Sequence, residues 1–250
     1  MQSLPQTGQS GIRKSLKSRF VLFFQGNPDS FFCWDFFVFM CFLGIFAKEK
    51  LKRKFNMRIL SEEQFNEEWA TFWSNMEKAG LASLYKEEGT KNLMKEAAAA
   101  LTEDTGLAYP GALIVHINLM TTIAEQLRTL VSSVFEIDEK SLLKVCLLHQ
   151  FSKAIMYKKN TDAWEIEKRG MNYKFASTAG KLKFGERSIY YAVKKGVKFT
   201  EEEWEAMECL DKEDTTKAGK MFDCILSTIV RQANELAYAL AKKENQNRED

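Results

Sequence analysis

Two histidines, His116 and His149, are the only ones in the chain, and each lies within an apolar segment of helical spacing. If these segments pack against each other, the two neutral imidazoles could approach and share a transition metal. In the alternative interpretation each is a core histidine, whose ring nitrogens bond backbone carbonyls or a neighbouring side chain. A metal site normally needs three or more protein ligands and supporting carboxylates. Taken alone, the histidines therefore favour the structural interpretation.

Short motifs surround both histidines and continue beyond them. Residues 109–116 place a proline and a glycine before an apolar turn that ends in His116, and residues 147–154 read Leu-Leu-His-Gln-Phe-Ser-Lys-Ala. Three further segments follow, at residues 184–188, 200–207 and 229–237. Taken in order, the five segments resemble the metal-dependent phosphohydrolases of the HD superfamily over about residues 107–240. The resemblance implies an all-α HD-like helical bundle.

The resemblance also implies a site for one or two divalent ions, but most of its ligands are missing here. Only His116 and His149 remain of the histidines and aspartates that hold the metal in this family. The other ligand positions carry different residues: Gln150 at the doublet aspartate, Asn234 at the distal aspartate, and Phe184 and roughly Leu210 at two further histidines.

Replacing the carboxylates changes the chemistry of such a site. Glutamine and asparagine keep the shape and the hydrogen bonds of the acids, but they lose the charge and are poor ligands for transition metals. Loss of supporting partners alone lowers metal affinity about 10–100-fold. We therefore expect a degenerate site with no bound cofactor. If Gln150 and Asn234 point inward, they form a neutral hydrogen-bonded cluster with His116 and His149.

Such a cluster has several possible uses. It could be structural, or it could line a pocket for a neutral or phosphorylated small ligand. Lys153, one turn after His149, corresponds to the family's lysine and could provide a positive charge there; alternatively it is a solvent-exposed surface lysine. We expect a catalytically degenerate domain that binds a small nucleotide-like ligand or a protein partner.

Two other functions remain open at this stage. In the first, the chain is an active metal-dependent phosphohydrolase with remodelled ligands, which holds a divalent transition metal with His116, His149 and either Asp211 or Asp214. In the second, the chain is a purely structural helical scaffold. The acidic residues after position 210 are also typical of a solvated loop.

The elements that must position these residues are mostly helices. Ser61 with Gln64 predicts a helix start, Pro110 opens a long helix, and Asp138 and Thr200 are further predicted caps. Alternating residues around a Lys-Arg-Gly turn predict a small β-hairpin. The expected ranges are helices at 61–80, 90–101, 110–134, 138–155, 185–195, 200–210 and 221–242, with the hairpin at 161–177.

The chain divides by composition into three parts. Residues 1–56 hold nine basic and three acidic residues and 11 of the 19 phenylalanines, whereas the remainder is mildly acidic. We expect residues 57–243 to form the helical domain, and residues 244–250 a polar tail. The first segment is interpreted in three ways: a membrane anchor at residues 31–47, a docking or disordered tail, or an over-extended start with Met57 as the true first residue.

Charge and cysteine usage limit the partners. The acidic body has no large basic patch, so we expect no duplex nucleic acid as main partner. The five cysteines are widely spaced and form no Cys-x-x-Cys pair, which argues against a disulfide framework or a zinc knuckle. We therefore expect a cytoplasmic protein, with membrane association only if residues 31–47 are a genuine anchor.

Overall fold

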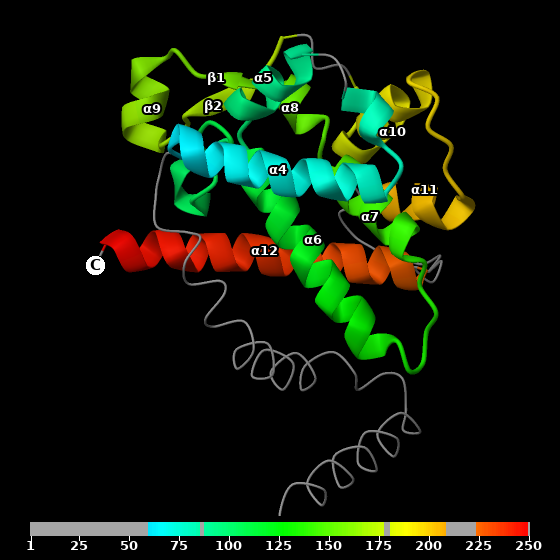
Figure 1. Cartoon of the computed structure of the whole chain (residues 1–250). Coiled ribbons are helices and arrows are strands. Elements are labelled where there is room, and N and C mark those ends of the chain that lie inside the picture. The colour runs from blue at the N-terminus through cyan, green and yellow to red at the C-terminus, as the bar shows by residue number, and fades with distance from the viewer. Residues whose placement is uncertain (1–59, 86–87, 178–180, 209–223, 250) are drawn as a thin grey trace, which may run out of the picture. The chain divides into compact units, whose positions relative to one another are not determined.

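The computed structural model describes residues 60–85, 88–177, 181–208 and 224–249, all within the second of two units of the chain, Met57–Asp250. This unit is all-α with one small antiparallel two-stranded sheet (Figure 1), which confirms the predicted class. The interpretations of residues 1–56 fall outside the described residues. So do Leu210, Asp211 and Asp214.

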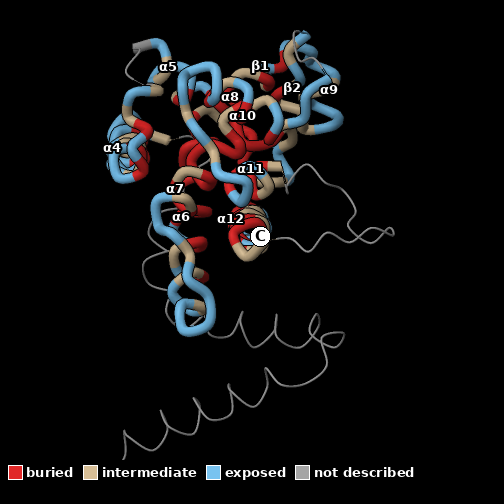
Figure 2. Tube along the Cα trace, turned by 90° about the vertical axis from the view of Figure 1, so that its right-hand side faces the viewer, coloured by how far each residue is buried: buried red, intermediate tan, exposed pale blue. Residues whose placement is uncertain are grey.

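Helix α6 (Ala112–Val131) lies at the centre of the domain. It packs along α12 (Ile225–Glu249) and against α4 (Glu62–Lys78) and α7 (Glu139–Leu148), as Figure 1 shows. Its predicted apolar stripe is buried from Leu113 to Leu127, but Leu130 is 50% exposed. The stripe therefore ends one turn earlier than the spacing predicts, because α6 there extends past the helices that cover it (Figure 2).

The helix starts follow local capping chemistry. Ser61 and Gln64 form a reciprocal capping box at the start of α4, and Asp138 accepts from Ser141 N at the start of α7. Thr200 and Glu203 form the equivalent pair at α11 (Glu201–Glu208). Each pair satisfies backbone N–H groups that the first helical turn leaves unbonded, so these three predictions are confirmed.

The prediction of a helix through four alanines is wrong. Helix α5 ends at Glu96 (Glu88–Glu96), and Ala97–Ala100 form a buried irregular segment. Ala99 N and Ala100 N donate to Leu107 O, while Ala97 O accepts from Leu113 N. Tertiary hydrogen bonds replace the helical ones here, and the small side chains allow the backbone to pack closely. Helix propensity is overridden by this packing.

The helix predicted from Asp138 to Ile155 is two helices. Helix α7 ends at Leu148, residues 149–152 form a turn, and α8 (Lys153–Met156) follows. Ser188 Oγ accepts from Ser152 N at 3.0 Å, and Ser152 Oγ donates to Phe184 O at 2.8 Å. These bonds to the α10 region hold the turn and therefore set the positions of His149 and Gln150.

The predicted hairpin exists, but it encloses a helix. Strand β1 (Tyr157–Lys159) pairs with β2 (Tyr173–Phe175), with Lys158 opposite Lys174. Helix α9 (Ala163–Arg169) lies between the two strands, although alternation predicts a strand there. Asp162 accepts from Trp164 N and Glu165 N, so an N-cap starts a helix in this polar stretch.

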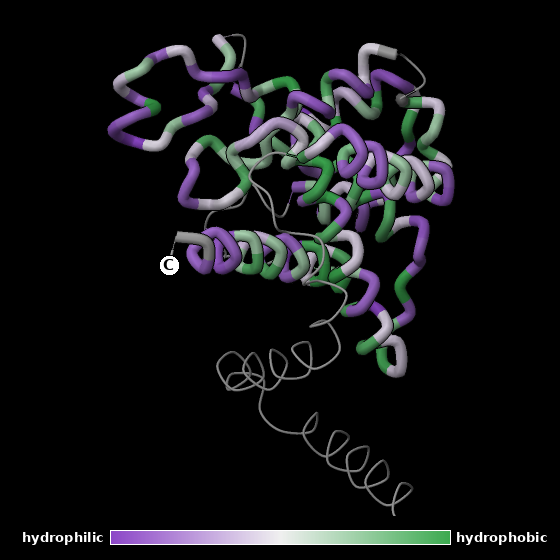
Figure 3. The backbone as a smooth tube through the Cα atoms, turned by 60° about the vertical axis from the view of Figure 1, so that its left-hand side comes forward, coloured by the Kyte–Doolittle hydropathy of each residue, from purple (hydrophilic) through white to green (hydrophobic). Residues whose placement is uncertain are grey.

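The last helices complete the domain. Helix α10 spans Phe184–Lys194, and α12 continues to Glu249, so most of the predicted polar tail is helical. Asn245 holds this last part by donating to Glu103 O at 3.2 Å. In Figure 3, α12 changes from hydrophobic to hydrophilic toward its carboxyl end. Two short 3-10 helices, η2 (Ala82–Tyr85) and η3 (Glu103–Thr105), lie in the connections.

The helices were also compared with the dimensions of a bilayer. Among the residues that the structure describes, no helix has both the length and the apolar content needed to cross a membrane.

Candidate functional site

Three helices bring the predicted site residues together. His116 lies near the start of α6, His149 and Gln150 lie in the turn directly after α7, and Asn234 lies on α12. Asn234 Oδ1 is 3.0 Å from His116 Nε2, and it also accepts a short hydrogen bond from Gln150 Nε2. One amide oxygen therefore joins the three helices at residues that are more than 80 positions apart from it in the sequence.

His149 lies beside this cluster, and its ring bonds the backbone of its own helix. Its Nδ1 lies 3.2 Å from Cys146 O, one turn earlier in α7, so this nitrogen carries the proton and donates. The ring is 1% exposed, and the Asn234 amide is near enough to oppose slightly the fall in its pKa. His149 therefore presents an unprotonated Nε2 in the protein interior.

Lys153 is buried rather than exposed, and this decides between the two predictions for it. Only 7% of the residue is accessible. Nζ donates to Ala99 O at 2.9 Å and to the hydroxyl of Tyr238. Three aromatic rings surround the ammonium, with centroids at 5.1 Å for Tyr238, 5.4 Å for Phe184 and 6.0 Å for Tyr157. A cation is thereby held against π-faces within the domain.

Tyr238 is a member of the cluster that the sequence reasoning missed. Its ring centroid lies 4.2 Å from that of His116, and its hydroxyl lies 3.1 Å from Ala99 O and 3.4 Å from Gln150 Oε1. Burial raises the pKa of the phenol, so it remains protonated. Its position in the sequence could have predicted this membership, because Tyr238 follows Asn234 by one helical turn and therefore lies on the same face of α12.

Both imidazoles are neutral at physiological pH. Burial is the main cause that lowers the pKa of His116 and of His149 to about 3, and the positive charge of Lys153 lowers both further. The low-dielectric interior penalises the imidazolium, and the ammonium repels it. Within the described part of the cluster, Lys153 is the charged side chain.

Among the described residues, one nitrogen of each imidazole has no hydrogen-bond partner. These atoms are Nδ1 of His116 and Nε2 of His149, both inaccessible to solvent. His116 donates through Nε2 to an amide oxygen, so its Nδ1 carries the lone pair. A buried acceptor without a partner costs about 1–3 kcal/mol. The cluster therefore contains two acceptors that no described residue satisfies.

The donor set does not fit the metal that the HD resemblance implies. The cluster offers two imidazoles and two amides, with an ammonium and the ring of Phe184 beside them. Across the described ranges, no group of three or more histidine, cysteine or acidic side chains is arranged to hold an ion. Asp211 and Asp214, the proposed additional ligands, lie outside these ranges.

The cluster has an inner and an outer side. His116, His149, Gln150 and Lys153 are buried, whereas Asn234, Tyr238 and Phe184 are only partly buried. The partly buried residues come from α12 and from the start of α10. The solvent-accessible part of the cluster is therefore formed by these three side chains.

Comparison with known proteins provides no relative for this chain: no family model, no curated protein and no solved structure matches it.

Proposed function

We propose that this chain is a catalytically degenerate HD-like domain that binds a small nucleotide-like ligand at the cluster around His116, His149 and Asn234. The resemblance aligns these residues, together with Gln150, with ligands of one metal centre. His116 and Gln150 meet at the side-chain oxygen of Asn234, which is the arrangement expected from that alignment and supports the proposal.

The charge of the cluster favours a ligand other than a metal ion. An HD site needs carboxylates to compensate the charge of its cations. Here two amides stand at carboxylate positions, and the ammonium of Lys153 is close enough to lower the pKa of both histidines. The same repulsion acts on a divalent cation, and it becomes an attraction for an anionic group such as a phosphate.

The unpartnered ring nitrogens are the observation that carries the proposal. Nδ1 of His116 and Nε2 of His149 are acceptors, so they suit a ligand that offers N–H or O–H donors. A nucleotide combines such donors, on its base and ribose, with a phosphate for Lys153. A structure selected only for stability would gain from apolar residues at these positions, since burying polar groups without partners is costly.

Thermal unfolding of the full chain tests this proposal. Nucleoside mono-, di- and triphosphates are added in turn, with inorganic phosphate as a separate probe. A ligand at about 100 times its dissociation constant adds about 2.7 kcal/mol, which corresponds to a rise of about 5–10 °C in the melting temperature for a domain of this size. We expect such a rise with at least one nucleotide.

Two variants locate the binding. Lys153→Met should abolish the rise, whereas Lys243→Met, which removes an exposed lysine on α12, should preserve it. His149→Phe keeps an aromatic ring without a lone pair, so it should fold and lose the rise. The absence of a rise across the whole panel in the wild-type chain would contradict ligand binding and favour a structural or protein-binding role.

Metal analysis of the same preparation separates this proposal from an enzyme with remodelled ligands. We expect no stoichiometric Mn, Fe, Ni or Zn and no hydrolysis of generic phosphate esters. Stoichiometric metal together with phosphatase activity would overturn the proposal.

A further inference from the structure

One face of the α10 region exposes both lysines and apolar side chains. Residues 181–199 contain six basic residues and one acidic residue. Five lysines of this stretch are exposed, before α10 (Lys181, Lys183) and at or after its last residue (Lys194, Lys195, Lys198), whereas Ile189 and Ala192 are buried. Three large apolar residues lie among the lysines and are substantially exposed: Leu182 (42%), Tyr190 (53%) and Val193 (48%).

The neighbouring helix α11 has the opposite charge. Residues 201–208 contain five glutamates and no basic residue. Glu203 is buried and paired with Lys144, but Glu201 and Glu202 are exposed. Trp204 is also exposed (45%), and its indole donates to Glu208 at 2.7 Å. The α11 face therefore combines negative charge with an exposed aromatic side chain.

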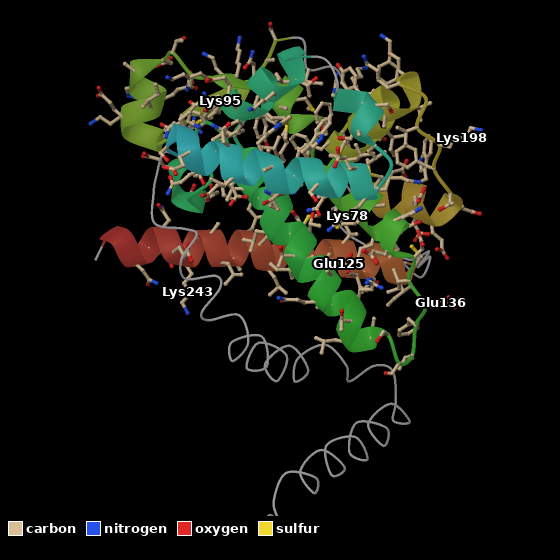
Figure 4. All side chains as sticks on the ribbon, in the orientation of Figure 1. Lys78, Lys95, Glu125, Glu136, Lys198 and Lys243 are labelled. Carbon is tan, nitrogen blue, oxygen red and sulfur yellow. The ribbon has the colours of Figure 1, made fainter. Side chains whose placement is uncertain are left out.

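The two faces lie next to each other. Helices α10 and α11 pack together, and they occupy the same side of the domain in Figure 1. Figure 2 is viewed from that side, and Figure 4 labels Lys198, in the short connection between the two helices, at the edge of the domain. The exposed basic, apolar and acidic side chains therefore lie on two neighbouring helices at one side of the domain.

We propose that this surface binds a second copy of the chain, with α10 of one copy facing α11 of the other. A two-fold axis between the two copies places α10 of each copy against α11 of the other. Each basic helix then faces an acidic helix, and this contact occurs twice. Tyr190, Val193 and Trp204 then lose their exposure to water between the paired charges. Opposite charges that meet in this way determine both the partner and its register.

The adjacent acidic helix argues for this occupant over an anionic one. A membrane rich in acidic lipids or a nucleic acid would attract α10 but repel Glu201 and Glu202 beside it. A partner that fits both faces must carry the same charges in reversed order. A second copy has this pattern without any further requirement on its sequence.

Light scattering of the full chain after size-exclusion chromatography tests the proposal. We expect a dimer whose dissociation constant rises with salt concentration, because part of the attraction between the copies is electrostatic. Charge reversal at Lys194→Glu with Lys195→Glu, or at Glu201→Lys with Glu202→Lys, should raise the dissociation constant at least about 100-fold, since like charges then meet twice across the axis. The chain carrying all four substitutions should form the dimer again.

A matched control changes the same charges elsewhere. Lys242→Glu with Lys243→Glu alters two exposed lysines of α12 (Figure 4 labels Lys243) and should leave the dimer intact. Circular dichroism verifies that each variant is folded. A monomeric wild-type chain would overturn the proposal, and so would a dimer insensitive to both reversals or a folded four-fold variant that stays monomeric. Binding of a monomeric chain to acidic-lipid vesicles would indicate a membrane partner instead.

Discussion

Two lysines of the domain, the partly buried Lys144 and the buried Lys153, are surrounded by very different polar groups. Lys144 pairs with both carboxylate oxygens of Glu203 at 2.7 and 2.8 Å, and Ser141 donates to the same carboxylate. Lys153 instead donates to a backbone carbonyl and a phenol hydroxyl. The first group joins α7 to α11 through compensated charges, which is the pattern of a structural contact.

The second group leaves hydrogen-bonding capacity unused. Beside Lys153, one nitrogen of His116 and one of His149 have no partner. The two lysines therefore represent two arrangements of buried polar groups: a compensated ion pair that holds helices together, and a cluster with unsatisfied acceptors, which we propose binds a ligand. Four experiments test this distinction.

The largest effect concerns the stability of the domain between pH 7 and pH 5. The folded-state pKa of about 3 for both histidines lies below the unfolded value of about 6.5. Below pH 6.5 the unfolded chain binds protons that the folded chain does not, so stability falls as the pH falls toward 3. At about 1.4 kcal/mol per histidine and pH unit, the free energy of unfolding should drop by about 4 kcal/mol from pH 7 to pH 5.

Urea unfolding at the two pH values measures this drop. His116 and His149 are the only histidines in the chain, and carboxylates titrate mainly at lower pH. The variant His149→Phe should therefore lose only about half as much stability over the same interval. A wild-type drop below about 1 kcal/mol would contradict the neutral buried imidazoles.

A smaller effect distinguishes the two lysines directly. Lys144→Met leaves the Glu203 carboxylate, whose side chain is 2% exposed, without its cation. Removing one partner of a buried pair costs about 3–5 kcal/mol, and we expect about 3 kcal/mol because Lys144 is partly exposed. Lys153→Met should cost less, about 1 kcal/mol, since Tyr238 still donates to Ala99 O. Equilibrium unfolding measures both losses of stability. A larger loss for Lys153→Met than for Lys144→Met would contradict the proposed difference between the two lysines.

The smallest expected effect is a gain of metal binding. Gln150→Asp with Asn234→Asp places carboxylates at two positions that the HD resemblance assigns to metal ligands. We expect Mn²⁺ or Ni²⁺ to raise the melting temperature of this variant by about 2–4 °C, or about 1 kcal/mol, with no rise in the wild-type chain. Gln150→Glu with Asn234→Gln is the control, because its side chains are longer and misplaced. Equal effects in both variants would indicate non-specific binding.

Local chemistry allowed much of the fold to be predicted from sequence. The caps at Ser61, Asp138 and Thr200 depend on residues only three positions apart, and each is present. The errors occurred where contacts with residues distant in the sequence determine the backbone conformation. Ala97–Ala100 bond to Leu107 and Leu113 in place of a helix, and the turn after His149 depends on Ser188 and Phe184.

The candidate site was likewise predicted from the sequence only in part. The convergence of His116, Gln150 and Asn234 was expected from short motifs, and the structure brings these residues together. Lys153 was left open between a buried and an exposed position, because its burial depends on rings from two other helices. The carbonyl of Ala99, which accepts from Lys153 and Tyr238, has no sequence signal, since every residue has one.

Nitrogen-15 NMR of the two imidazole rings can detect the buried, neutral histidines and their response to a ligand. We expect that neither histidine takes up a proton between pH 7 and pH 5, and that His116 Nδ1 and His149 Nε2 resonate as unprotonated nitrogens. Both signals should shift when the nucleotide that raises the melting temperature is added. A ring that titrates near pH 6.5, or unprotonated signals that the nucleotide leaves unchanged, would contradict a neutral cluster open to a ligand.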